Sequence, residues 1–334
     1  GALAGGLLQV VAQWPALRSI GFADVPSFAF DDDVKQVLHR IAPLTLGIGI
    51  YSIDLVISRR FLSGLGPGAQ SYFSWALRLC DFPQGIFVMA LSTAALPALS
   101  TLAAANAGDE FARTWAHSMG LAMFVAVPTS VLLVVLAEPI VVTLFQRGAF
   151  DARAAHETAR AVTWQGGAIW TVAAVRQTVP AMYALGDTRT PVLVSAVDLC
   201  AFILLAFFLR GPLGHVGVSV AVAGSSAVQM VLLLIGLRRR LAVWPGASLL
   251  RSMARTLVAS GIAAAAGWGS ARIVVTDLGP RSIARMLPGL AGGFGFVATF
   301  LLVAWGLQAP ELDDILGVLR QRRKRGRTEA EVAR

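Results

Sequence analysis

Long apolar stretches recur along this chain of 334 residues, and they allow only a fold that crosses a membrane many times. Hydrophobic residues make up 56% of the sequence and charged residues 14%, whereas soluble domains carry about 25% charged residues. A helix needs about 20 apolar residues to cross a bilayer. Nine stretches read as spans, the first of them cut short: residues 1–13, 38–60, 71–100, 115–136, 151–183, 191–208, 216–237, 249–273 and 286–307. The sequence therefore predicts an all-α polytopic membrane protein with about nine transmembrane helices, the first incomplete.

The span at residues 71–100 differs from the others because it carries charges together with a helix breaker. Arg78 and Asp81 lie in its first half, and Pro83 follows directly. A charge at membrane depth is costly, so such a residue usually faces a protein interior or a wet cavity. Pro83 removes a helix hydrogen bond, so we expect a kink or break beside the charges. Arg78 therefore either faces a cavity or has a structural role, in which it reaches the interface or pairs with Asp81.

Other residue types argue against several classes of function. The two cysteines, Cys80 and Cys200, lie in apolar stretches, and the four histidines show no metal-ligand spacing. The net charge of +9 comes from arginines clustered at helix ends, which is not the pattern of a nucleic-acid-binding protein. No nucleophile triad and no phosphate-binding glycine loop is present. We therefore expect no enzyme activity, no cofactor, no metal and no nucleic-acid partner.

The distribution of basic residues predicts how the chain is oriented. On the side of the C-terminal tail, called side A, the connecting segments and the tail hold 17 basic residues, and on the opposite side, called side B, they hold 9. The positive-inside rule makes side A cytoplasmic. The C-terminus is then cytoplasmic and residue 1 emerges from the outer face, so we expect that an N-terminal part of the natural protein is missing. The basic cluster at residues 320–327 is expected to attract anionic membrane lipids.

Five stretches together resemble one family of membrane proteins. They read GGLLQVVAQWPALRSIGF from residue 5, SYFSWALRLCDFPQGIFVMALSTAALPALS from residue 71, LFQRGAFD from residue 144, YALGDTRTPV from residue 183 and GPLGHVGVSVA from residue 211. In this order and at these intervals they are similar to the MurJ (MviN) family of lipid II flippases, within the superfamily of multidrug, oligosaccharidyl-lipid and polysaccharide exporters. The resemblance covers about residues 1–240 in register. It implies a fourteen-helix, two-lobe flippase, of which this chain holds about helices 6–14.

The resemblance also implies a division of the chain. Residues 1–13 would end the last helix of the N-terminal lobe, residues 14–37 would be a cytoplasmic linker, and residues 38–237 would form a C-terminal lobe of six helices. Residues 238–309 would add a helix pair, and residues 310–334 a basic cytoplasmic tail. The pair is rich in small residues, as in GIAAAAGWGSA from residue 261. By resemblance it forms a groove for a lipid tail, although close helix packing explains the same residues.

Candidate substrate-binding residues follow from the resemblance. Arg78 matches an arginine that the family places in a Tyr-Ala-Asp-Arg-Leu motif, although Leu77 replaces the acid before it. A guanidinium there suits a pyrophosphate, since its fork of donors fits phosphate oxygens. Asp54 in the preceding span could partner Arg78 or the neighbouring Arg59, or contact substrate. Arg176, in the middle of the span at residues 151–183, either lines the cavity or reaches the cytoplasmic face.

Positions that the family uses for a coupling cation are altered in this sequence. Ser58 stands where the family often has an aspartate, and Phe202 and Ala206 stand where it has polar residues one helical turn apart. A cation such as sodium needs several oxygen ligands, of which Ser58 offers one. Asp198 lies one turn away and could substitute, although a neighbouring helix could equally satisfy it. Ser58 and Asp198 are therefore the candidate ligands of a coupling cation.

The resemblance implies that the protein moves lipid II, a polyprenyl-pyrophosphate-linked peptidoglycan precursor, across the bacterial inner membrane by alternating access. Arginines that the family carries in its N-terminal half are absent from this sequence, so we expect no transport by this fragment alone. Two alternatives remain open. One is an exporter of another polyprenyl-linked sugar, and the other is a non-transporting membrane scaffold in cell-envelope assembly.

Overall fold

The computed structural model describes residues 2–19, 32, 35, 53, 55–274, 283–315 and 317. The chain separates into two compact units, residues 1–43 and 44–334. In the first unit, helix α1 (Ala2–Ser19) covers the predicted first span and continues to Ser19. The Arg18 guanidinium lies 5.5 Å from the ring centre of Trp14, one helical turn earlier. Asp54 and most of the linker predicted at residues 14–37 lie outside the described residues.

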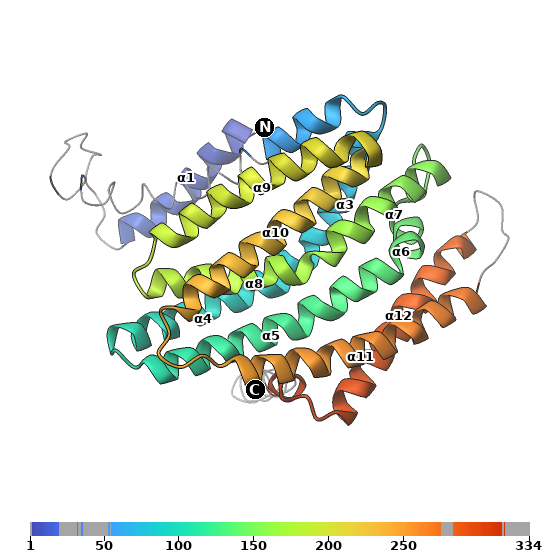
Figure 1. Ribbon diagram of the computed structural model, residues 1–334. Helices are drawn as coiled ribbons and strands as arrows, with labels where there is room; N and C mark the ends of the chain where they lie inside the picture. The colour runs from blue at the N-terminus through green and yellow to red at the C-terminus, as the bar shows by residue number, and fades with distance from the viewer. Residues whose placement is uncertain are drawn as a thin grey trace, which may run out of the picture. The chain divides into compact units, whose positions relative to one another are not determined.

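The second unit is a bundle of helices, and no strand occurs among its described residues (Figure 1). Residues 55–63 are helical and lead through a turn into α3. The helices that follow are α3 (Ala69–Pro83), α4 (Met89–Ala104), α5 (Gly108–Val135), α6 (Ala137–Phe145), α7 (Ala152–Gly167), α8 (Ile169–Ala184), α9 (Arg189–Leu213), α10 (His215–Arg238), α11 (Gly246–Ile273) and α12 (Leu287–Gly306). The all-α prediction is confirmed.

Five helical segments of the described chain are long and apolar enough to cross a membrane. They are Ala69–Ala104, Gly108–Val135, Arg189–Leu213, His215–Arg238 and Ala284–Gly306. Helix α11 has 28 residues and occupies the predicted span at 249–273, but its arginines lower its mean hydropathy. The links at residues 105–107, 185–188 and 239–245 lie on side A, and the links at residues 64–68 and 146–151 lie on side B (Figure 1).

The span predicted at residues 151–183 is two helices of 16 residues each, so the prediction of one continuous helix is wrong. The helix is interrupted at Ala168, after Gly166 and Gly167. Two contacts hold the interruption: the backbone N–H of Trp170 donates to Ser130 Oγ of α5 at 3.2 Å, and Thr171 Oγ1 donates to the Ala168 carbonyl at 2.7 Å. A side chain from α5 thus takes part in the local hydrogen bonding, as helix interruptions commonly require.

The irregularity predicted beside Pro83 is a π-helical turn. The turn η1 (Gln84–Val88) joins α3 to α4, so the chain remains helical from Ala69 to Ala104. Pro83 is the last residue of α3 and Gly85 lies within the turn. Turns of this kind are rare and occur frequently at functional sites. The charged residues of the span therefore lie next to its one irregular segment within the described residues.

Helices α11 and α12 pack with their backbones close together. A Cβ atom added at Gly267 would lie 2.9 Å from the Gly292 carbonyl oxygen, and one added at Gly292 would lie 3.1 Å from the Gly267 carbonyl oxygen. Only glycine fits such an approach without a shift, as in other small-residue helix interfaces. Close packing therefore accounts for these two glycines, whereas a groove for a lipid tail stays a prediction.

Candidate functional site

Arg78 lies exposed on one face of α3, which it shares with Trp75 and Phe82. Its guanidinium carbon lies 5.4 Å from the Trp75 ring centre. Trp75 in turn packs against Phe145 of α6, with ring centres 5.0 Å apart. Among the described residues no ion pair joins Arg78 to Asp81. The aromatic contact orients the guanidinium and leaves its N–H donors available.

Asp81, one turn further along α3, interacts electrostatically with Arg176 of α8 instead. Arg176 is half-buried. The neighbouring backbone is fixed, because Ser92 Oγ of α4 donates a hydrogen bond to the Arg176 carbonyl at 2.8 Å. The two halves of the irregular helix thus both meet α8 near Arg176. Whether Arg176 contacts substrate stays a prediction.

A buried glutamine ties the π-helical turn to two other helices. Gln177 Nε2 donates to the Val88 carbonyl at 3.1 Å, and Gln177 Oε1 accepts from Ser118 Oγ of α5 at 2.9 Å. The Gln177 side chain is therefore satisfied in the interior, as buried amides usually are. Gln84, in the turn itself, is also buried, and its Oε1 has no hydrogen-bond partner among the described residues. The sequence predicts that Gln177 lies in the middle of a span, but it does not indicate which groups form hydrogen bonds with its side chain.

The remaining predicted substrate residue, Arg59, is exposed on the helical segment of residues 55–63. No ion pair of the described residues joins it to Arg78. Asp54, the other predicted partner of these arginines, lies outside the described residues. Of the four predicted substrate-binding residues, Arg176 thus interacts with Asp81, Arg78 lies one turn before Asp81 on α3, and Arg59 lies near the side-B end of the preceding helix.

The predicted cation positions meet in an apolar cluster. Phe202 and Ala206 of α9 are fully buried with Leu62 and Phe73, and the Phe61 ring packs on Phe202 with centres 6.4 Å apart.

Ser58 is also buried, one turn before Leu62. Asp198 faces Ser225 of α10, with one carboxylate oxygen lacking a partner among the described residues. The contact with Ser225 thus supports the interpretation that a neighbouring helix satisfies the Asp198 carboxylate. Ser58 and Asp198 stay predictions as cation ligands.

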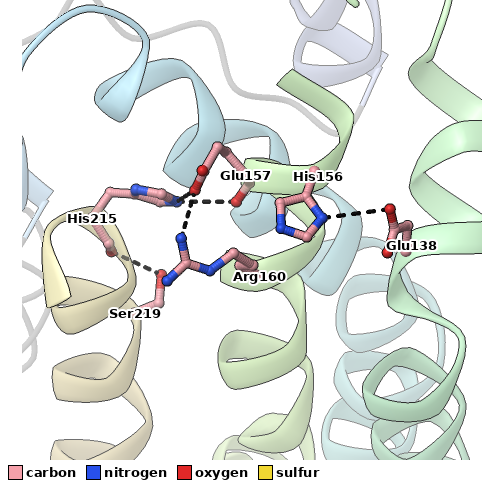
Figure 2. Close-up of polar contacts among 6 residues, drawn as sticks. All are labelled: Glu138, His156, Glu157, Arg160, His215 and Ser219. Atoms are coloured by element: carbon pink, nitrogen blue, oxygen red, sulfur yellow. Dashed lines mark hydrogen bonds and ion pairs between the residues drawn. The ribbon is translucent and has the colours of Figure 1, made fainter. Parts of the chain in front are cut away.

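Polar contacts join α6, α7 and α10 at side B (Figure 2). Glu157 of α7 is central: its Oε2 lies 3.0 Å from Arg160 Nη1 and 3.6 Å from His215 Nε2 of α10, which also lies 3.0 Å from the Glu157 carbonyl oxygen. His156 Nδ1 lies 3.4 Å from Glu138 Oε1 of α6. The His215 ring packs on Tyr72 of α3 with centres 5.5 Å apart. These contacts hold the side-B ends of α3, α6, α7 and α10 together.

Asp187 plays the corresponding part at side A, in the link between α8 and α9. Its Oδ1 accepts from the Thr190 backbone N–H at 3.0 Å, and its Oδ2 accepts from Thr190 Oγ1 at 2.8 Å and Arg240 Nη2 at 2.9 Å. Burial raises the pKa of Asp187, but the hydrogen bonds from Thr190 and the Arg240 charge outweigh it and hold that pKa below its usual value. The carboxylate therefore joins the start of α9 to the end of α10.

The fold defines a multi-pass helical membrane protein of the transporter type, in which a long apolar helical segment with a π-helical turn carries Arg78 and Asp81. A comparison with family models assigns the family. The model described as Lipid II flippase MurJ matches residues 1–289. The chain belongs to the MurJ family, as its motifs suggested.

Curated relatives agree with this assignment. The chain is 29% identical over 246 residues to the lipid II flippase MurJ of Burkholderia cenocepacia, a match that covers 71% of this chain and 47% of that protein. It is 27% identical over 344 residues to the probable lipid II flippase MurJ of Rhizobium meliloti, and this match covers the whole of this chain and 62% of that protein. The chain thus spans about half the length of most of these relatives.

Solved structures share the fold. A structure described as lipid II flippase MurJ in an inward closed conformation matches with a TM-score of 0.66 at 17% identity, covering 86% of this chain and 59% of that one. An outward-facing multidrug transporter of the MATE family, in the MOP superfamily, matches with a TM-score of 0.52 at 15% identity, covering 82% of this chain and 65% of that one. At these identities the likeness concerns the fold alone.

Proposed function

We propose that the protein takes part in moving lipid II across the bacterial inner membrane by alternating access. The observation that carries the proposal is the family match over residues 1–289. The exposed Arg78 of α3 supports it, because a guanidinium at membrane depth needs an anionic or aqueous partner. In this proposal side A is cytoplasmic, as the excess of basic residues on that side suggests.

In this proposal Arg78 engages the pyrophosphate of the substrate. The contact with Trp75 holds the guanidinium at the surface of α3, and no ion pair of the described residues occupies it. Arg176 of α8, which interacts electrostatically with Asp81, contributes a second guanidinium to the substrate site. Arg59 and Asp54 are further substrate candidates on the preceding helix. Ser58 and Asp198 are weak candidates for a coupling cation, because hydrocarbon side chains fill the family's other cation positions.

The test is genetic complementation in a strain depleted of its own lipid II flippase. The full-length gene should restore growth, and the Arg78→Ala variant should not, although it reaches the membrane at a normal level. Loss of a charge-assisted hydrogen bond to phosphate removes about 1.5–3 kcal/mol, equivalent to a transport rate lowered by roughly tenfold or more. Arg153→Ala is the matched control, since Arg153 is exposed at the start of α7 and should be dispensable.

Two results would favour the alternatives. If the wild-type gene fails to restore growth but supports export of another polyprenyl-linked sugar, the substrate assignment is wrong. If Arg78→Ala leaves activity at the level of Arg153→Ala, the guanidinium has no part in transport. A protein whose function is insensitive to both substitutions fits a membrane scaffold better than a flippase.

A further inference from the structure

A cavity of about 330 Å³ with charged side chains in its lining lies on side A, away from the candidate site on α3. It forms where the first turns of α5 and α11 meet the helical segment of residues 310–315. All three elements contribute charged side chains, which are Arg113, His117, Arg251, Arg255, Glu311 and Asp314. The three elements are far apart in the sequence, so the cavity exists only in the folded bundle.

The two acids of the cavity are already engaged. Glu311 is 7% exposed, and its Oε1 accepts a hydrogen bond from Ser252 Oγ of α11 at 2.5 Å. Asp314 Oδ2 lies 3.7 Å from His117 Nε2 of α5. These contacts attach the segment of residues 310–315 to α5 and α11. The carboxylates are thus occupied by a hydroxyl and an imidazole rather than by the arginines.

The arginines of the cavity keep their guanidinium groups available. Arg113 uses only its Nε, which donates to the Asp109 carbonyl at 3.2 Å. Arg251 and Arg255 lie one turn apart on α11, and among the described residues neither forms a hydrogen bond or an ion pair. Three guanidinium groups around one cavity favour an anion, and their donor geometry matches phosphate oxygens.

The start of α11 adds to this preference for an anion. The helix begins at Gly246 without a side-chain cap, and Pro245, Ser248 and Leu249 also line the cavity. The N–H groups of a first helical turn have no partner within the helix, and the helix dipole favours negative charge there. Helix α11 has 28 residues, so its dipole is fully developed. The arginines and the helix start thus favour the same kind of ligand.

An apolar stripe leads away from the cavity along α11. Val258 is 54% exposed and Ile262 is 49% exposed, and they lie seven residues after Arg251 and Arg255. Residues seven apart lie on the same face of a helix. A ligand with a phosphate and hydrocarbon chains would match both features, whereas a soluble phosphate would use only the cavity.

We propose that this cavity binds the phosphate of an anionic phospholipid headgroup in the leaflet on side A, with the acyl chains along Val258 and Ile262. Basic cavities between membrane helices are known as sites for such headgroups. The bound lipid is a resident membrane lipid and not the transported substrate, so the inference goes beyond the proposed function. The lipid would link α5, α11 and the segment of residues 310–315.

The experiment titrates the purified full-length protein with phosphatidylglycerol and counts bound lipids by native mass spectrometry. Phosphatidylcholine with the same acyl chains tests the need for net negative charge, and inorganic phosphate tests the need for chains. The variant Arg251→Gln/Arg255→Gln should bind phosphatidylglycerol about tenfold more weakly, since it loses two charge-assisted contacts. The variant Arg251→Lys/Arg255→Lys, which keeps the charge, should retain part of the affinity.

The matched control is Arg238→Gln/Arg239→Gln. These two arginines are exposed on side A at the end of α10, outside the cavity, and their loss changes the net charge equally. The control should change the affinity by less than about twofold, as expected for screened surface charges. Thermal unfolding of each variant establishes that it is folded.

Three outcomes would overturn the proposal. Equal losses in the cavity variant and the control would mean that affinity follows surface charge alone. Equal binding of phosphatidylcholine would mean that the anionic headgroup is not recognised. Binding of inorganic phosphate as tight as that of phosphatidylglycerol would assign the cavity to a soluble anion. None of these outcomes depends on transport, so the test is separate from that of the proposed function.

Discussion

Asp187 offers the sharpest test of how the helix ends are held on side A. Its side chain is 5% exposed and accepts three hydrogen bonds, two from Thr190 in the first turn of α9 and one from Arg240 at the end of α10. Replacement by alanine removes all three contacts. Replacement by asparagine keeps an acceptor for the Thr190 backbone N–H but removes the negative charge. The two variants therefore separate the hydrogen bonds of the link from its charge.

The contacts give the magnitudes. Loss of a side-chain acceptor at a helix start costs about 1 kcal/mol, and a hydrogen bond to a charged group contributes about 1.5–3 kcal/mol. We therefore expect Asp187→Ala to lower the free energy of unfolding by roughly 2–4 kcal/mol. The Arg240 side chain is 56% exposed, so solvent screens the ion pair. The charge alone then contributes about 1 kcal/mol or less, which is the expected cost of Asp187→Asn.

The pH dependence follows from the direction of the pKa shift. The pKa of Asp187 is below its usual value in the folded protein, because the bonds from Thr190 and the Arg240 charge outweigh burial. A carboxylate with a depressed pKa stabilises the fold fully above its unfolded pKa of about 3.9. That contribution is lost as the pH falls through the folded pKa. The difference between wild type and Asp187→Asn should therefore be constant above about pH 5 and shrink in more acidic buffer.

The assay is thermal unfolding in detergent, followed by tryptophan fluorescence at pH 7, pH 5 and pH 3. A loss of 1 kcal/mol lowers Tm by about 2–4 °C in a domain of 150–250 residues, so the alanine variant should show the larger decrease. Asp109→Asn is the control, because Asp109 is exposed in the first turn of α5 and its side chain has no contact among the described residues. A double-mutant cycle with Arg240→Gln isolates the ion pair.

One pattern of results would refute this reasoning. If Asp187→Ala and Asp109→Asn unfold at the same temperature, the hydrogen bonds on Thr190 contribute nothing. If the cycle with Arg240→Gln shows no coupling and the cost of Asp187→Asn does not shrink between pH 5 and pH 3, the charge is not the cause of that cost. Either result would remove the account of Asp187 as a link between α9 and α10.

Two further substitutions test the interior of the bundle by the same unfolding assay. Gln177→Leu should cost about 1–3 kcal/mol, because it leaves a hydroxyl of α5 and a carbonyl of the π-helical turn unpaired, and Gln229→Leu, which removes one longer bond of 3.3 Å, should cost less. Gly217→Ala should be more damaging than Gly224→Ala, because the added methyl would collide with the backbone carbonyl of Leu209 in the first case and with a movable side-chain end in the second. Equal effects within either pair would contradict the packing described above.

Much of the fold could be predicted because its causes are local in sequence. Length and apolar character define the spans at α5, α9 and α10, and Pro83 marks the irregular turn. The interruption at Ala168 was missed because its hydrogen-bond acceptor, Ser130, is on another helix. Two adjacent glycines inside an apolar stretch carried too little information to place it.

The partners of polar residues could not be predicted for a related reason. Gln177 meets a hydroxyl 59 positions away in the sequence and a carbonyl 89 positions away. The cavity on side A depends on α5, α11 and residues 310–315 meeting in space, and its arginines looked like ordinary residues at helix ends. Arg78 was recognised because the cost of a charge at membrane depth does not depend on which helix packs against it. The sequence thus indicated a charge within an apolar span, but it did not indicate the hydrogen bonds of the interior.

The polar residues of the irregular helix fall into two groups with different physical demands. Ser92 of α4 has a partner inside the bundle, and so has the Val88 carbonyl, so these groups are explained by folding alone. Arg78 is exposed, and among the described residues its contact is the aromatic face of Trp75. A guanidinium facing lipid would cost about 2.5–3.5 kcal/mol on insertion scales. Since no contact among the described residues offsets that cost, we expect the compensating partner to be water, an anion or another protein surface along α3, which is what a pathway for an anionic headgroup would supply.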